Sequence, residues 1–148
     1  MSMTADGTYA GDLNSTDAWQ RLADDEHAVL IDVRTRAEWT FVGVPDLQPV
    51  GKVAALVEWQ SFPSMDVNAG FVDQVAEAMR ERGAATDTPV FFLCRSGARS
   101  RAAAIAMTSA GLSAAYNISD GFEGPQDASR HRGSVAGWKA AGLPWVQS

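Results

Sequence analysis

Cys94 is the only cysteine in the chain, and the residues around it could give its sulfur a chemical role. The motif CRSGARS, residues 94–100, places a glycine three positions and an arginine five positions after the thiol. Arg95, Arg99 and Arg101 follow with no acidic residue between them. Nearby cations and the N-terminus of a helix favour a thiolate over a thiol, and the thiolate is the nucleophile. The motif therefore predicts nucleophilic chemistry on a small anion.

The opposite interpretation of Cys94 is an inert core residue, which is the commonest role of a lone cysteine. Packing alone does not explain why a glycine and an arginine, Gly97 and Arg99, follow Cys94 at three and five positions. Cys94 also lies where an apolar segment ends and a helical pattern begins. Glycine permits the tight turn in which successive backbone N–H groups surround an anion. We therefore expect a reactive Cys94.

The composition excludes several classes of site and partner. A single cysteine rules out an internal disulfide, a CxxC pair and a multi-thiolate metal site. His27 and His131 are too far apart for zinc-ligand spacing, so we expect no metal site. A net charge of −6 argues against nucleic acid or a membrane surface as partner. No signal segment or apolar run of about 20 residues is present, so a cytoplasmic location is expected.

Short apolar segments alternate with helical patterns along the chain. Strands are expected at 28–33, 53–59, 89–93 and 114–118, and helices at 14–25, 68–82, 100–110 and 134–141. Thr35 and Glu38 have capping-box spacing, so a further short helix is expected there. This alternation predicts an α/β fold with a central, mainly parallel sheet flanked by helices. Residues 1–12 are expected to form a flexible lead-in, and residues 13–148 a single domain.

Side chains that follow the strands should meet at one edge of the sheet, because ligands of α/β folds bind beyond the carboxyl ends of the strands. Cys94 is expected at this edge. Asp32 and Arg34 lie at the end of another strand. We expect them to brace that end through an ion pair or hydrogen bonds, and direct contact with a donor is the alternative. Trp39 and Trp59 are expected to be packing residues rather than the lining of an entrance.

The motif CRSGARS resembles the Cys-x-x-Gly-x-Arg-Ser/Thr active-site loop of rhodanese-like sulfurtransferases. Residues 30–39 (LIDVRTRAEW), 117–124 (NISDGFEG) and 137–145 (GWKAAGLPW) resemble other segments of that family, in the same order. The similarity covers nearly the whole chain and implies a rhodanese-like three-layer domain of the single-domain bacterial type. One segment departs from the family: VGVPDL, residues 42–47, lacks the histidine of a Gly-His-Ile-Pro-Gly type sequence. The shape of the pocket rim is therefore left open.

The resemblance implies a rhodanese-type thiosulfate sulfurtransferase. Cys94 would take sulfane sulfur from a small anionic donor such as thiosulfate and pass it, as a persulfide, to cyanide, a thiol or a protein. The substrate-binding residues implied are Arg95, Ser96, Gly97, Ala98, Arg99 and Ser100, whose backbone N–H groups would hold the terminal sulfur. Either Arg95 or Arg99 would attract the donor. Such chemistry needs no cofactor or metal.

Two other functions are compatible with a reactive Cys94. A cysteine phosphatase or arsenate reductase places arginine six positions after the cysteine, whereas this chain has Ser100 there and Arg99 one residue earlier. The shorter loop suits a sulfur atom better than a tetrahedral phosphate. A persulfide-carrier or regulatory module with little turnover is the other alternative, and the intact loop favours activity over it. His131 is expected to be a solvated surface residue rather than a catalytic acid.

Overall fold

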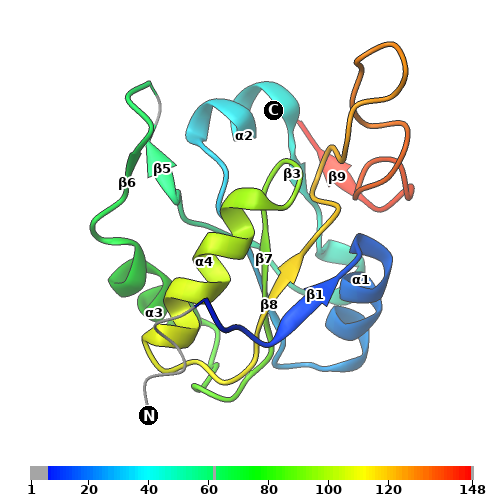
Figure 1. Ribbon diagram of the computed structural model, residues 1–148. Coiled ribbons are helices and arrows are strands. Elements are labelled where there is room, and N and C mark those ends of the chain that lie inside the picture. The colour runs from blue at the N-terminus through cyan, green and yellow to red at the C-terminus, as the bar shows by residue number, and fades with distance from the viewer. Residues whose placement is uncertain (1–6, 62, 148) are drawn as a thin grey trace.

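The computed structural model describes residues 7–61 and 63–147, and its centre is a five-stranded sheet (Figure 1). The strand order is β1-β8-β7-β2-β4, and the neighbours pair in parallel. These strands are β1 (Gly11–Leu13), β2 (Val29–Asp32), β4 (Ala55–Leu56), β7 (Val90–Leu93) and β8 (Ala115–Ile118). The helices are α1 (Ser15–Asp24), α2 (Arg36–Val42), α3 (Phe71–Glu81) and α4 (Ala98–Ser109), with the 3₁₀ turn η2 (Gln48–Val50). The predicted α/β class is confirmed.

Two short antiparallel ribbons complete the secondary structure. β3 (Val44–Pro45) pairs with β9 (Trp145–Val146), and β5 (Gln60–Ser61) pairs with β6 (Asp66–Val67). Both ribbons and α2 lie toward the end of the sheet at which the parallel strands finish (Figure 1). Within the described residues, no helix has both the length and the apolar character to cross a membrane.

The two faces of the sheet pack against different elements, as a strand's alternating side chains require. Val90 and Phe92 of β7 belong to one core cluster, which includes residues of α3 and α4. Phe91 and Leu93 belong to the other, which includes residues of α1 and Trp138 of the late loop. Cys94 comes two residues after Phe92 and joins the first cluster, so its side chain lies on the α4 side of the sheet.

Side-chain caps begin the first two helices, and the second of these caps is the predicted capping box. Asn14 precedes α1 and accepts the backbone N–H of Asp17 at 2.8 Å. Thr35 and Glu38 form both halves of the predicted capping box at the start of α2. These caps satisfy N–H groups that have no partner within the helix. The capping box also fixes Glu38 beside the end of β2.

Three predicted boundaries are wrong by a few residues. The helix α4 begins at Ala98, two residues before the predicted start, because Gly97 provides a left-handed turn there. The helix α3 begins at Phe71, three residues after the predicted start, and Asn68 accepts the N–H of Gly70 from outside the helix. The strand predicted at 53–59 is assigned only over Ala55–Leu56.

The predictions for the two ends of the chain need correction. Residues 134–141 do not form the predicted helix, because the N–H groups of Trp138 and Lys139 donate to carbonyls of Gly121 and Phe122 instead of to the preceding turn. The lead-in predicted for residues 1–12 is wrong for residues 11 and 12, which belong to β1 and pair with β8. Residues 1–6 lie outside the described residues.

Candidate active site

Cys94 lies between the end of β7 and the start of α4, with only 1% of its surface exposed. Its Sγ accepts the backbone N–H of Gly97 at 3.1 Å and lies 3.1 Å from Oγ of Ser100. The first N–H groups of α4 have no acceptor within the helix, and this helix begins four residues after Cys94. A helix N-terminus carries about half a positive charge. The sulfur therefore occupies a position that stabilises negative charge.

The loop that holds Cys94 and the loop after β8 approach each other so closely that only glycine fits at two positions, Gly97 and Gly121. Gly97 has φ of 108°, and a Cβ atom there would lie 2.4 Å from the carbonyl oxygen of Ser119. Gly121, in the loop after β8, approaches Arg95 so closely that a Cβ would lie 2.3 Å from its carbonyl oxygen. Phe122 then donates its N–H to the carbonyl of Cys94 at 2.8 Å. The loop after β8 thus fixes the backbone of the cysteine loop.

Ser100 connects the sulfur to β8 and β1. Its Oγ lies 2.5 Å from Oδ1 of Asn117, and Nδ2 of Asn117 donates to Asp12 at 3.0 Å. Asp12 thereby fixes which end of the Asn117 amide faces the hydroxyl. A hydroxyl has one proton to donate, so Ser100 donates either to Asn117 or to the sulfur at a given moment. Both Ser100 and Asn117 are buried, so this arrangement is shielded from water.

Arg99, predicted to attract a donor, pairs with Glu38 of α2. Its guanidinium makes two hydrogen bonds to that carboxylate, at 2.6 and 2.9 Å. Burial alone raises the pKa of Glu38, but the hydrogen bonds from Arg99 and Thr35 outweigh it and lower this pKa to about 2. The same pairing raises the pKa of Arg99. The two side chains are only 17% and 18% exposed, so this ion pair forms part of the wall beside the sulfur.

The predicted ion pair between Asp32 and Arg34 is present and fully buried. The Arg34 guanidinium donates to the Asp32 carboxylate at 2.6 and 2.9 Å and to the carbonyl of Gly43 at 2.7 Å. It also stacks on Phe122, 4.2 Å from the ring centroid. Because Phe122 holds the carbonyl of Cys94, this pair supports the loop from behind.

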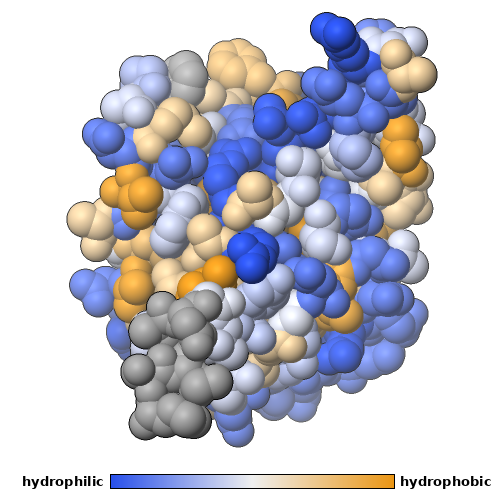
Figure 2. Space-filling view, viewed as in Figure 1, coloured by the Kyte–Doolittle hydropathy of each residue, from blue (hydrophilic) through white to orange (hydrophobic). Residues whose placement is uncertain are grey.

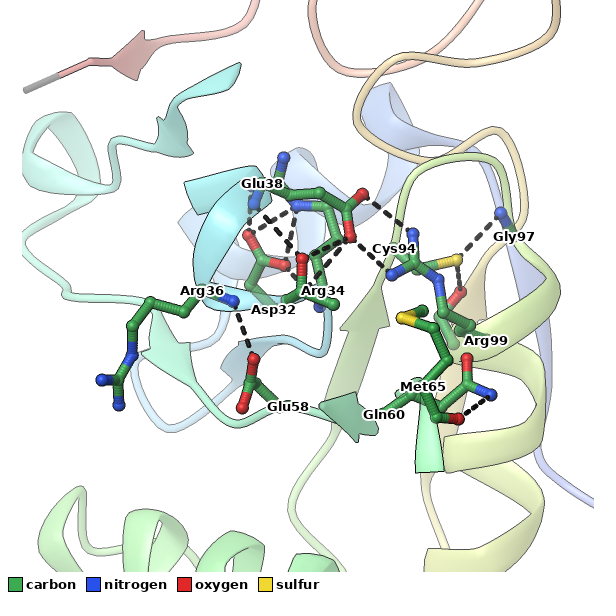
Figure 3. Close-up of polar contacts among 12 residues, drawn as sticks. Asp32, Arg34, Arg36, Glu38, Glu58, Gln60, Met65, Cys94, Gly97 and Arg99 are labelled. Atoms are coloured by element: carbon green, nitrogen blue, oxygen red, sulfur yellow. Dashed lines mark hydrogen bonds and ion pairs between the residues drawn. The ribbon is translucent and has the colours of Figure 1, made fainter. Parts of the chain in front are cut away.

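A cavity of about 360 Å³ opens above the sulfur. Its lining residues are Glu38, Gln60, Met65, Cys94, Arg95, Ser96, Ala98 and Arg99. Figure 3 shows the Arg99 guanidinium between the Glu38 carboxylate and the sulfur of Cys94. Met65 and Gln60 lie below this guanidinium in the same view. We call it the thiol cavity. The predicted loop residues therefore gather around one sulfur, with Gly97 and Ser100 contacting it directly.

Sequence reasoning missed three contributors to the thiol cavity. Met65 and Gln60 come from the β5–β6 ribbon, where Gln60 donates to the carbonyl of Met65 at 3.1 Å, and no motif marks either residue. Glu38 was recognisable only as a helix cap. Its position opposite Arg99 follows from the parallel sheet, which brings the ends of β2 and β7 side by side.

Three other residues singled out in the sequence do not line the thiol cavity. Trp59 packs edge-on against Phe71, with ring centroids 5.0 Å apart. Trp39 lines a separate hollow beside α2. His131 is exposed. Among the described residues, no group of three or more potential metal ligands was found.

Comparisons with known proteins show the family to which the chain belongs. The family model described as the STR4 middle domain matches residues 11–148. The uncharacterized protein RP600 of Rickettsia prowazekii is 40% identical over 131 residues, which covers 88% of this chain and 93% of that protein. The rhodanese-like domain-containing protein 4 of Arabidopsis thaliana is 25% identical over 90% of this chain, but the match covers only 25% of the plant protein.

Two solved structures are also similar. The crystal structure of Rv0390 from M. tuberculosis has 48% identity and a TM-score of 0.84, covering 95% of this chain and 100% of that one. The polysulfide-sulfur transferase homodimer from Wolinella succinogenes has 23% identity and a TM-score of 0.56, covering 93% of this chain and 78% of that one, and it supports the fold alone. This chain belongs to the STR4 middle domain family and has a rhodanese-like fold.

Proposed function

We propose that the protein is a rhodanese-type thiosulfate sulfurtransferase with Cys94 as its nucleophile and sulfur carrier. The observation that carries this proposal is the position of Sγ, which lies at the base of the thiol cavity with donors from Gly97 and Ser100 at 3.1 Å. The kinship with rhodanese-like proteins supports the same chemistry.

In the first half-reaction, the Cys94 thiolate attacks the outer sulfur of thiosulfate. A Cys94–sulfur bond forms, the sulfur–sulfur bond of thiosulfate breaks, and sulfite leaves with the electron pair. The product is a cysteine persulfide, and no external oxidant or reductant is consumed. This is covalent catalysis in two steps, each with its own leaving group.

In the second half-reaction, a thiophilic acceptor attacks the outer sulfur of the persulfide. With cyanide, thiocyanate forms and the Cys94 thiolate is regenerated as the leaving group. The free N–H groups at the start of α4 and the Ser100 hydroxyl are suited to the terminal sulfur, because they can stabilise its negative charge. Arg95 is the exposed cation of the loop, whereas the charge of Arg99 is offset by Glu38. We therefore assign attraction of the donor first to Arg95.

The same geometry disfavours phosphatase or arsenate reductase chemistry. The sixth position after the cysteine holds Ser100, whose hydroxyl contacts the sulfur rather than reaching over a substrate. Arg99, the preceding residue, is bound at both ends of its guanidinium by Glu38. Neither residue is free to clamp a tetrahedral oxyanion in the way an arginine at that position would.

The test is mass spectrometry of the intact protein after incubation with thiosulfate and then with cyanide. We expect an adduct of about 32 Da on Cys94, which cyanide removes as thiocyanate. Cys94→Ser should acquire no adduct and produce no thiocyanate, while keeping the unfolding midpoint of the wild type. Absence of the adduct with every sulfane donor tried would refute the proposal. An adduct that forms without turnover on cyanide or thiols would instead support the carrier module.

A further inference from the structure

A second cavity, of about 550 Å³, adjoins the thiol cavity. The two cavities share Glu38 and Arg95 as lining residues, so a molecule in the second one reaches the loop of Cys94. The charged side chains and the histidine that line it are Glu38, Arg95, Glu123, Arg130, His131 and Arg132. We call it the basic cavity. Gln126, Arg130, His131 and Arg132 come from the loop drawn in orange in Figure 1.

The basic cavity carries positive charge in a chain whose net charge is −6. Arg95, Arg130 and Arg132 contribute three cationic groups. Of the two carboxylates, that of Glu38 is neutralised within its own ion pair with Arg99, and only that of Glu123 remains. Figure 2 shows hydrophilic side chains over this loop and between it and the start of α4. The local excess of positive charge favours an anionic occupant.

The loop that presents these cations is held in one arrangement. The carboxylate of Asp127 accepts the N–H groups of Ser129 and His131 and the hydroxyl of Ser134, at 2.8 to 3.0 Å. Arg132 is tied to the carbonyl of Gly124 at 2.7 Å. Arg130 is the exposed cation at the turn, with a left-handed backbone (φ 65°), whereas Arg132 is partly buried.

Both cavities are large enough for an organic molecule, since sites of roughly 300–1,000 Å³ typically hold such ligands. Under the proposed function, sulfite has left when the acceptor arrives, so the thiol of the acceptor can enter the thiol cavity and reach the persulfide. Because the two cavities share Glu38 and Arg95, the rest of that acceptor extends into the basic cavity.

We propose that the basic cavity binds the carboxylates of a small, peptide-sized thiol that accepts sulfur from Cys94, with Arg130 as a specificity-determining residue. This inference rests on the proposed function. The acceptor's thiolate attacks the outer sulfur of the persulfide, the sulfur–sulfur bond to Cys94 breaks, and Cys94 leaves with the electron pair. The acceptor departs as its own persulfide, so atoms and electrons balance without a further reactant.

The experiment compares glutathione, which has two carboxylates, with its diethyl ester, which has none. With thiosulfate as donor, kcat/KM should be about tenfold higher for glutathione, and raising the ionic strength to about 1 M should remove most of this preference. Arg130→Asn should lower the preference by about threefold, since an exposed charge contact contributes modestly. Asparagine is chosen because it tolerates left-handed backbone. Arg80→Gln, a matched loss of charge on α3, should leave the preference unchanged.

Transfer from thiosulfate to cyanide is the internal control, because cyanide is too small to reach from the persulfide into the basic cavity and has no carboxylate. Arg130→Asn should preserve that rate, which also shows that the variant is folded. A glutathione-to-ester ratio of kcat/KM near one in the wild type, or a ratio that Arg130→Asn leaves unchanged, overturns the inference while the proposed function stands. Failure of the wild type to form thiocyanate would refute the proposed function itself.

Discussion

Two arginine–carboxylate pairs flank the cysteine loop, and they differ in almost every physical respect. Asp32 and Arg34 are completely buried behind the loop, where Arg34 also contacts Phe122. Glu38 and Arg99 lie in the wall of the thiol cavity and remain partly exposed. A buried pair is costly to break because the remaining charge has no water around it, whereas an exposed pair is screened and exchangeable.

The difference in burial indicates that the two pairs have different roles, one structural and one electrostatic. The buried pair fixes the positions of β2, Gly43 and the Phe122 ring relative to one another. Its role is therefore to hold the cysteine loop in place. The wall pair keeps a guanidinium next to the sulfur while masking its charge with Glu38. An anionic donor that enters the cavity therefore competes with a carboxylate already in place.

Breaking the buried pair should have the largest effect on stability. Arg34→Met leaves the Asp32 carboxylate buried without a cation, and we expect a loss of about 3–5 kcal/mol in the free energy of unfolding. Urea denaturation at pH 7 measures this loss. Arg80→Met is the matched control, because Arg80 pairs with Glu77 at an exposed site and should cost less than about 1 kcal/mol. Equal losses in the two variants would remove the distinction between the pairs.

The sequence predicted the buried pair but not the wall pair, and the reason is physical. Asp32 and Arg34 are two residues apart at the end of one strand, so local geometry brings them together. Glu38 and Arg99 are far apart in sequence and meet only because β2 and β7 are neighbours in the sheet. The order of strands in a sheet depends on tertiary structure, so a local pattern of residues does not predict it.

The same limit explains the other corrections. Short apolar segments located the strands β2, β7 and β8, because burial on both faces leaves a local signal. An apolar segment also located β4, although this strand lies at the edge of the sheet and its Leu56 is 45% exposed. The helix predicted at 134–141 failed since its N–H groups bond to a loop that is distant in sequence. Met65 and Gln60 reach the thiol cavity from a ribbon that carries no motif. Cys94 and its loop were recognisable because one short segment contains both the nucleophile and its donors.

Removing the carboxylate of the wall pair should have a smaller effect on stability, and one that depends on pH. Because the pKa of Glu38 is lowered from 4.5 to about 2, its charged form stabilises the fold above pH 4.5 and loses this contribution as the pH falls toward 2. Glu38→Gln should therefore cost about 1–3 kcal/mol at pH 7. The difference from wild type should shrink between pH 4.5 and 2.

Urea denaturation of both proteins across that pH range measures the effect. Glu26→Gln is the control, because its side chain is 87% exposed and should change stability little at any pH. A cost for Glu38→Gln that stays constant down to pH 2 would assign the effect to lost packing rather than to the charge.

The smallest expected effect is a change in KM for thiosulfate, the proposed donor. Glu38→Gln removes the charge that masks Arg99, so the thiol cavity becomes more positive by one unit where thiosulfate enters. One charge near a partly exposed anion contributes on the order of 1 kcal/mol, so KM for thiosulfate should fall about fivefold with cyanide held constant. Glu26→Gln changes the net charge equally at a distance from the site and should leave KM unchanged. The buried pair has no equivalent effect, since no anion reaches Arg34. A KM that rises in Glu38→Gln would mean that the carboxylate orients Arg99 for binding instead of competing with the donor.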